Sequence, residues 1–398
     1  MRSIRLIAAL FFLVCCVLLG SCGVQPLQSG DVLSQQLFCE NRPQSRSDMR
    51  VGLYISYLDL ANMQPQTEQQ AKAFAASVAA NALSIGCTDV FLQLRAFGDA
   101  LYNSEVYPSM QQTVLPAFSP ESDFACCLLE TLHAVGIRVH AWLNPYRLYP
   151  HADTEALYGF AAQYTVSWQQ GLYLRPDSER AKQLVLQGVE EVLQLGFDGV
   201  HFDDYFYPTT DADFDAEAYA AYLQAGGALA LTEWRTQAVS DLMARCYETV
   251  KGYGNDKVFS LSPDGSVQRN LNVHCADVVS WCSQQGYLDI VCPQLYYGFE
   301  NESMPFAQVL AQWQTLCSTA ELMPVLSAYK IASADSWAGS GSGEWQQRND
   351  ILGRQYALAA QSGCAGVSFY RYDSLFHPDE TVAQAVMQEL TLLTEEMA

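Results

Sequence analysis

Basic residues are scarce in this sequence. Its 398 residues include 21 Lys and Arg against 43 Asp and Glu, so the formal net charge is −22 at pH 7. It contains neither a basic stripe nor a run of like charge. A strongly negative surface repels polyphosphate, which argues against nucleic acid as a partner. A neutral or weakly charged glycan fits this charge balance better.

Long apolar runs are absent after the N-terminus. One such run, residues 6–19, follows Arg2 and Arg5, and this order predicts a secretory signal over residues 1–21. The run is shorter than the ~20 residues that a membrane span needs. Since no second run of that kind follows, we expect an exported protein that is attached to a membrane without crossing it.

The end of the signal carries a cysteine. Leu19-Gly20-Ser21-Cys22 resembles the lipobox of bacterial lipoproteins, which implies cleavage before Cys22 and a diacylglyceryl group on its thiol. An ordinary signal peptide with a chance cysteine is the alternative. After Cys22, residues 23–48 are rich in Gln, Ser and Pro and predict a flexible tether. We therefore expect a lipid anchor at the extracytoplasmic face of the cell membrane, and one domain over residues 49–398.

Zinc-type cysteine spacing is also absent. None of the 13 cysteines forms a C-x₂-C pair. Several of them, such as Cys87 and Cys292, fall inside expected helices and strands, where a free cysteine behaves as a small buried apolar residue. The sequence therefore predicts neither a structural zinc site nor a disulfide framework.

One pattern repeats along the domain: an amphipathic helix, a glycine and a short apolar strand. The glycine supplies the left-handed residue that ends a helix, at Gly86, Gly136, Gly196, Gly286 and Gly363. Eight strands are expected, over residues 50–56, 89–95, 137–144, 197–203, 258–262, 288–296, 323–329 and 365–370. This alternation predicts an α/β fold, a (β/α)₈ TIM barrel. A doubly wound open sheet is the alternative.

Helix starts agree with this pattern. Thr67 and Gln70 form a capping-box signature, and Ser119-Pro120 places proline at a first helical position. The connections that follow strands are long, at residues 96–118, 145–176, 205–233 and 331–348. Barrel enzymes build their sites from these loops at the C-terminal ends of the strands.

Side chains alternate across a strand, so odd and even positions face opposite sides. Val200 and Phe202 suit the helix-packed outside, which turns His201 and Asp203 inward. The same test predicts a polar inner set that also includes Gln93, Arg95, His140, Trp142, Asn144, Ser260, Ser262, Asp264, Gln294, Tyr296, Ser327, Tyr329, Ser368 and Tyr370. A satisfied hydrogen-bond network would explain any one of them, whereas the whole set favours a polar substrate site.

Asp203 and Asp204 end the fourth strand. Glycosidic cleavage needs one carboxyl group to protonate the leaving oxygen and another carboxylate as nucleophile or base. Asp203 points into the mouth. Asp204 is expected at the rim, where a structural and a catalytic role are equally open. Asp264 and the loop residue Glu344 are candidates for the partner carboxyl.

Six blocks in order resemble a known family, the glycoside hydrolase family 10-like bacterial proteins (DUF187). The blocks are residues 51–57 (VGLYISY), 95–100 (RAFGDA), 141–147 (AWLNPYR), 198–208 (DGVHFDDYFYP), 292–300 (CPQLYYGFE) and 328–330 (AYK). The resemblance implies a (β/α)₈ barrel that acts on glycosidic bonds, with peptidoglycan glycan as the substrate class. Where the family has an apolar or small residue after Ser-Pro, this chain has Asp264, which makes Glu344, or Glu105 or Glu300, the better partner carboxyl.

The sequence thus predicts a glycoside hydrolase that needs no cofactor or metal, with Asp203, Asp204 and Glu344 as catalytic candidates. The expected substrate-binding residues are Arg95, Trp142, Asn144, His201, Tyr205, Asp264, Gln294, Tyr296, Lys330 and Tyr370. Two alternatives remain. One is a non-catalytic surface lipoprotein that captures glycans, and the other is a metal hydrolase that uses His140, His201 and Asp203.

Overall fold

The computed structural model describes residues 49–397, apart from 64, 66, 110–122, 149–163 and 170. The predicted signal, Cys22 and the tether lie outside the described residues, as does the predicted helix start at Ser119-Pro120. The helix that follows Pro120 begins at Phe124, where the Asp123 side chain accepts a hydrogen bond from the backbone N–H of Cys126.

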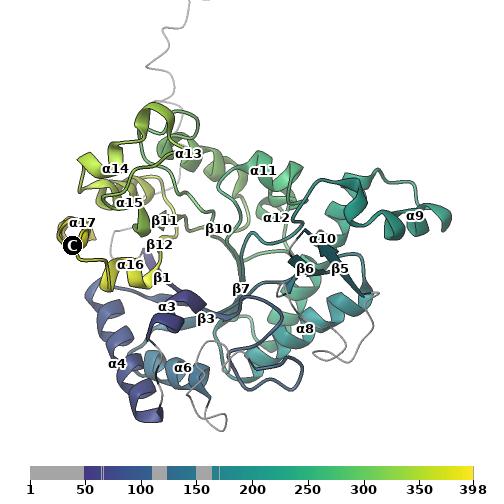
Figure 1. Ribbon diagram of the computed structural model, residues 1–398, viewed down its shortest axis with the longest axis horizontal. Helices are drawn as coiled ribbons and strands as arrows, with labels where there is room; N and C mark the ends of the chain where they lie inside the picture. The colour runs from purple at the N-terminus through teal and green to yellow at the C-terminus, as the bar shows by residue number, and fades with distance from the viewer. Residues whose placement is uncertain are drawn as a thin grey trace, which may run out of the picture. The chain divides into compact units, whose positions relative to one another are not determined.

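Parallel strands form the centre of the fold, and helices surround them (Figure 1). Their order is β10-β9-β8-β7-β3-β2-β1-β12-β11. The strands are β1 (Arg50–Ile55), β2 (Asp89–Arg95), β3 (Arg138–Leu143), β7 (Gly199–Phe202), β8 (Val258–Leu261), β9 (Ile290–Val291), β10 (Glu321–Leu322), β11 (Val325–Ser327) and β12 (Gly366–Tyr370).

The two ends of this order belong to one stretch of chain, because β10 and β11 are separated by only Met323-Pro324. On one side, the amides of Met323 and Val325 donate to the carbonyls of Val291 and Pro293 beside β9, both at 2.9 Å. On the other side, the Pro324 carbonyl accepts from Ser368 of β12 at 2.9 Å. The ring is therefore closed with eight strand positions. The predicted barrel is confirmed, and the doubly wound alternative is wrong.

The sixth expected strand is much shorter than predicted. Strand β9 covers Ile290–Val291 instead of residues 288–296, since Pro293 has no N–H to continue the ladder. Beyond it, Gln294 makes single bridges to Asp264 and to Val325. The strand ends at the mouth are therefore held in register even where the ladder stops.

A helix follows each strand position. The helices are α3 (Tyr57–Met63), α4 (Glu68–Ser84), α6 (Phe124–Ala134), α8 (Glu179–Gln194), α9 (Ala216–Gln224), α10 (Leu231–Tyr253), α11 (Val267–Asn272), α12 (Val278–Ser283), α13 (Phe306–Leu316), α14 (Glu344–Gln347), α15 (Ile351–Gln361), α16 (Tyr372–Phe376) and α17 (Ala383–Met397). All five predicted stop glycines have positive φ, between 65° at Gly86 and 98° at Gly196. Thr67 caps α4 through the Gln70 amide, as its signature predicted. Within the described residues, no helix is long and apolar enough to span a bilayer.

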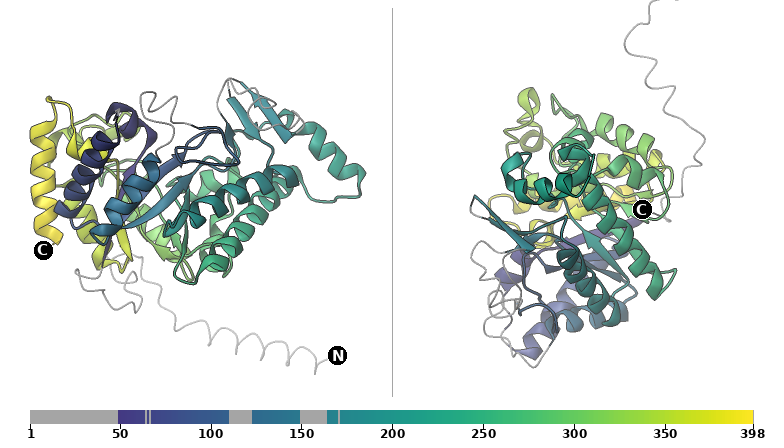
Figure 2. Two further views of the ribbon diagram at one scale, coloured as in Figure 1. Left: turned by 90° about the horizontal axis from the view of Figure 1, so that it is seen from below. Right: turned by 90° about the vertical axis from the view of Figure 1, so that its right-hand side faces the viewer.

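Two of the long connections that follow strands contain structure of their own. In the connection that follows β3, β4 (Arg147–Leu148), β5 (Thr165–Trp168) and β6 (Gly171–Leu174) form a small antiparallel sheet in the order β4-β6-β5. After β7 come a short 3₁₀ turn, η3 (Ala212–Phe214), and α9. The β5–β6 hairpin and α9 lie at the opposite end of the domain from α17 (Figure 2).

The predicted inside and outside faces are confirmed with one exception. Tyr54, Phe91 and Trp142 form an inner cluster with residues of β9 to β11, whereas Val200 and Phe202 pack in the outer core beneath the helices. Arg95 is the exception. An irregularity in β2 pairs Gln93 with Trp142 but Arg95 with the outward residue Leu143. Since one extra residue in a strand reverses the alternation, Arg95 faces the helices.

Candidate active site

Asp203 follows β7 directly and lies at the mouth of the barrel. Its side chain is almost fully buried, with 2% of the residue exposed. The indole Nε1–H of Trp142, at the end of β3, donates to Oδ2 at 3.0 Å, and the Tyr205 amide approaches Oδ1 at 3.4 Å. The carboxyl group is thus fixed in direction by two neighbouring strand ends.

Asp204 is less buried than Asp203 and is held from the other side. Gln294, which follows β9, donates from Nε2 to Oδ1 of Asp204 at 3.2 Å and to the Ser262 carbonyl at 3.1 Å. The pair Asp203–Asp204 therefore spans the mouth between the ends of β3 and β9.

The electrostatics of this pair favour keeping a proton. Burial, and then the negative charge of Asp204, raise the pKa of Asp203 well above its ordinary value, although Trp142, Tyr205 and Arg147 lower it. Burial also raises the pKa of Asp204, but the hydrogen bond from Gln294 and the nearby His274 lower it. Because two adjacent buried carboxylates repel each other, we place the shared proton on Asp203, the more deeply buried member.

His201 lies below the pair inside the barrel. One ring nitrogen, Nε2, is 3.1 Å from the Tyr54 hydroxyl, and Nδ1 is 2.8 Å from the Ser260 hydroxyl. Burial lowers the pKa of His201, which favours the neutral ring. Both nitrogens are thus occupied within the protein. The structure gives His201 a place in the floor of the site and not the predicted contact with substrate.

Two other acids at the mouth are each paired with a cation. Asp264 forms an ion pair with Arg269 at 2.8 Å, and Asp335 forms one with Lys330 at 2.6 Å. Lys330 also donates to the carbonyl of Tyr296 at 2.7 Å. Asp203 and Asp204 form no ion pair within the described part of the chain, which sets them apart from these acids.

Glu344 has a structural position. It begins α14, is 3% exposed, and accepts hydrogen bonds from the amides of Phe299 at 3.1 Å and Glu300 at 2.9 Å. Its carboxylate therefore holds the loop that follows β9. The predicted role of Glu344 as the partner carboxyl conflicts with this arrangement, because both oxygens are already bound to backbone N–H groups.

Two predicted substrate-binding residues also lie away from the mouth opening. Arg95 is fully buried, and its guanidinium carbon lies 4.7 Å from the centre of the Tyr107 ring, whose hydroxyl donates to the Leu184 carbonyl of α8. Asn144 is buried and donates from Nδ2 to the Ala96 carbonyl at 2.8 Å. Arg95 was predicted to face inward, which is wrong because of the strand irregularity. Asn144 ties the end of β3 to the end of β2.

The remaining predicted residues do meet at the mouth. Tyr296 and Tyr370 are in contact, with ring centres 5.8 Å apart, and Tyr370 also packs edge-on against Trp142 at 6.4 Å. Tyr205 is exposed beside Asp203. Asp264, Gln294, Tyr296 and Lys330 line one cavity of about 310 Å³.

Arg147 is a residue that the candidate set left out. It starts β4, and its guanidinium lies between the rings of Phe97 and Tyr205, at 4.8 and 4.5 Å from their centres. Its positive charge acts on Asp203. Its position three residues after Asn144, in the block AWLNPYR, was the available signal for it. The stacking itself needed the folded loops.

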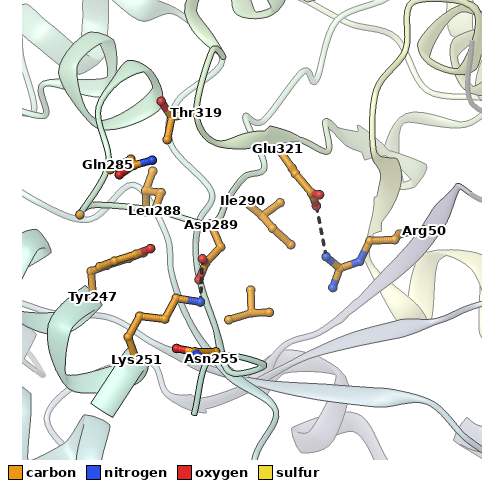
Figure 3. A pocket seen from close by; sticks show the side chains of 12 residues that line it. Arg50, Tyr247, Lys251, Asn255, Gln285, Leu288, Asp289, Ile290, Thr319 and Glu321 are labelled. Carbon is orange, nitrogen blue, oxygen red and sulfur yellow. Dashed lines mark ion pairs between the residues drawn. The ribbon is translucent and has the colours of Figure 1, made fainter. Parts of the chain in front are cut away.

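A larger hollow, of about 780 Å³, lies at the other end of the barrel (Figure 3). It is lined at the start of the strands by Arg50, Val258 and Ile290, and its charged groups are paired as Arg50–Glu321 at 3.6 Å and Lys251–Asp289 at 2.7 Å. Since the functional end of a barrel is the C-terminal end of its strands, we assign the site to the mouth and not to this hollow.

A comparison of the sequence with family models decides what this barrel is. The model described as glycosyl hydrolase-like 10 matches residues 51–338, more than half of the chain. The chain belongs to the glycosyl hydrolase-like 10 family. This result confirms the resemblance found in the six sequence blocks.

Relatives of this glycosyl hydrolase-like protein cover it in part. Glycosyl hydrolase YngK of Bacillus subtilis is 29% identical over 254 residues, which are 58% of this chain and 49% of the relative. Glycosyl hydrolase DigH of Escherichia coli K12 is 29% identical over 263 residues, 58% of each chain. The matches thus span about half the length of these curated relatives.

Solved structures show the same fold at low identity. The glycoside hydrolase domain of PgaB (BpsB) from Bordetella bronchiseptica has a TM-score of 0.58 and 15% identity, covering 85% of this chain and 98% of that domain. Alpha-L-fucosidase isoenzyme 2 from Paenibacillus thiaminolyticus has a TM-score of 0.56 and 12% identity, covering 87% of this chain and 49% of its own. These likenesses support the barrel architecture alone.

The metal-hydrolase alternative fits this family member poorly, because both of its histidines are bound to other side chains of the barrel. His140 is 2.8 Å from Asp89, which also binds Arg50 and Arg138, at the start of the strands. His201 binds Tyr54 and Ser260. The described residues hold no group of three or more His, Cys, Asp or Glu side chains arranged to bind a metal ion.

The position of Glu344 predicts the effect of its replacement. We expect Glu344→Gln to lower the free energy of unfolding by about 1–2 kcal/mol, because an amide side chain replaces a charge-assisted acceptor of two backbone N–H groups. Denaturant unfolding monitored by circular dichroism measures this. Glu300→Gln, at an exposed carboxylate on the same loop, is the matched control and should change stability little. Equal stability of the two variants would contradict the anchoring role.

Proposed function

We propose that this protein is a glycoside hydrolase that cleaves O-glycosidic bonds in the glycan of bacterial peptidoglycan. The observation that carries the proposal is the Asp203–Asp204 pair at the mouth of a barrel of the glycosyl hydrolase-like 10 family. The nearby acids Asp264 and Asp335 are each bound to a cation, and Glu344 is bound to backbone amides. The pair combines burial and a raised pKa, and it forms no ion pair within the described residues.

The geometry supports distinct tasks for the two carboxyl groups. Asp203, whose pKa is raised well above its ordinary value, holds the proton and donates it to the leaving glycosidic oxygen as a general acid. Burial raises the pKa of Asp204 as well, but Gln294 and His274 offset part of this rise. Asp204 provides the carboxylate that stabilises the positive charge of the oxocarbenium-like transition state or activates water. Trp142 holds Asp203 in its direction.

Peptidoglycan glycan as substrate is supported by two features. The family that the sequence resembles is linked to cell-wall glycan, and the acidic surface suits a weakly charged sugar polymer. The exposed Tyr205 and the rings of Tyr296 and Tyr370 offer surfaces on which the C–H faces of sugars can stack. Mass spectrometry of products from cell-wall glycan, with and without stem peptides, identifies the bond that is cleaved.

The alternative is a surface protein that binds glycan without cleaving it, and Asp203→Asn separates the two. We expect this variant to lose at least 100-fold of reducing-end release, because the amide cannot donate the required proton, while it still binds glycan. Asp213→Asn, at an exposed acid on the loop after β7, is the control and should keep full activity. Unchanged reducing-end release by Asp203→Asn would defeat the hydrolase proposal.

The hydrogen bond from Trp142 to Asp203 predicts the direction in which the pH profile of kcat/KM shifts when Trp142 is replaced. The indole N–H stabilises ionised Asp203, so Trp142→Phe raises the pKa of Asp203 further. An acid catalyst is lost as pH rises through its pKa, so the alkaline limb of kcat/KM should move to higher pH. Trp281→Phe, which removes an indole bond to Ser240 elsewhere, is the control and should leave the limb in place. A limb that stays or moves to lower pH in Trp142→Phe would contradict the role of Asp203.

We also propose that Cys22 carries the lipid anchor and that residues 23–48 tether the barrel to the extracytoplasmic face of the membrane. The lipobox-like sequence supports this. We expect Cys22→Ala to move the protein from the membrane fraction to the soluble fraction in cell fractionation, because no acyl chains would hold it. Cys39→Ala is the matched control within the tether. Retention of Cys22→Ala in membranes at the level of the control would refute the anchor.

A further inference from the structure

Trp337 lies between β11 and α15 and is 87% exposed. Five of the six other tryptophans are buried, and Trp168 is partly exposed. A large apolar ring left in water forgoes the favourable free energy of burial. A chain that buries nearly all of its indoles and exposes this one leaves a surface available for a ligand.

The segment that carries Trp337 is well held. Its own amide donates to the Asp335 carboxylate at 3.2 Å, and the Ala338 amide donates to the Asp335 carbonyl at 3.0 Å. The Ala338 carbonyl accepts from the Glu302 amide at 3.0 Å, which ties this segment to the loop after β9. The indole is therefore presented from a fixed backbone, so that little conformational entropy is lost when a ring stacks on it.

Trp337 borders the cavity of about 310 Å³ at the mouth. This volume is at the lower end of the ~300–1,000 Å³ typical of ligand pockets. The lining offers carboxylate, amide, phenol and ammonium groups, from Asp264, Gln294, Asn301, Tyr297 and Lys330. Such groups form hydrogen bonds with the hydroxyls around a sugar ring, and an indole contacts its apolar C–H face.

The cavity adjoins the carboxyl pair. Gln294 lines it and at the same time donates to Asp204. In the ring of strands, β8, β9 and β11 carry the cavity, and β7 with Asp203 comes directly before β8. A sugar in the cavity would thus be a neighbour of the sugar whose bond is cleaved.

We propose that Trp337 and this cavity form a sugar-binding subsite that takes a pyranose ring of the glycan beside the Asp203–Asp204 pair. The ring stacks on the indole, and its hydroxyls bind the polar lining. This subsite rests on the proposed function, whose substrate it extends by at least one sugar on the β8–β11 side of the cleaved bond.

Fluorescence of the exposed Trp337 indole can show whether a sugar covers it. The probe is peptide-free glycan strands prepared from purified peptidoglycan, added to the full chain carrying Asp203→Asn so that the strands stay intact. Acrylamide quenches the fluorescence of exposed tryptophans. The part of the quenchable fluorescence that is missing in Trp337→Ala belongs to Trp337, and we expect glycan to protect this part from acrylamide. We expect Trp337→Ala to weaken glycan binding roughly three- to tenfold, and Trp337→Tyr to restore most of it, since an aromatic face is retained.

Met387→Ala is the matched control, because Met387 is an apolar side chain of α17 that is 63% exposed. It should leave binding and quenching unchanged. Since Trp337 is exposed, its replacement should not unfold the chain, and circular dichroism checks this.

The outcomes separate the subsite from the hydrolase. Glycan that binds without protecting the Trp337 component, and with equal affinity for Trp337→Ala, overturns the subsite and leaves the proposed function standing. Protection by glycan in a protein whose wild type releases no reducing ends supports the subsite and rejects hydrolysis. Absence of any glycan binding by the wild-type chain overturns the subsite, and reducing-end release then tests the proposed function separately.

Discussion

Ring closure is the constraint on which the rest of this structure depends. The interrupted strand β10–β11 pairs with β9 on one side and β12 on the other, so every strand position has two neighbours. Closure gives each strand one face toward the helices and one toward the interior. It also gathers all eight strand ends around a single mouth. Polar residues on the inner face must then bind one another or serve at that mouth.

Both kinds of inner polar residue occur along the barrel: those that bind one another and those that serve at the mouth. Near the strand starts, Asp89 is bound by Arg50, Arg138 and His140, and it is fully buried. Above it, His201 binds Tyr54 and Ser260. At the strand ends, Asp203 and Asp204 have hydrogen-bond donors but no ion pair within the described residues. A buried carboxyl pair of this kind is destabilising unless it retains a proton. Proton retention is also the property that an acid catalyst needs.

Several residue patterns were sufficient for prediction. Alternation identified the inner and outer faces, because the period of a strand is two wherever its ladder is regular. The stop glycines were identified because a left-handed residue strongly favours glycine. Asp203 was recognised from parity and from its place at a strand end. The prolines Pro293 and Pro324 shortened the observed strands because they lack an N–H group, although the barrel itself was predicted.

By itself, the sequence determined the repeating order of helix and strand, the closed fold and the inward direction of Asp203, since these follow from local periodicity. Only the tertiary structure decided which charged groups meet. An irregularity at Leu94 turned Arg95 outward, and backbone amides of the loop after β9 bind the Glu344 carboxylate. Folding of the loops after β2, β3 and β7 placed Arg147 between two rings. Such contacts join residues far apart in sequence, and no local period records them.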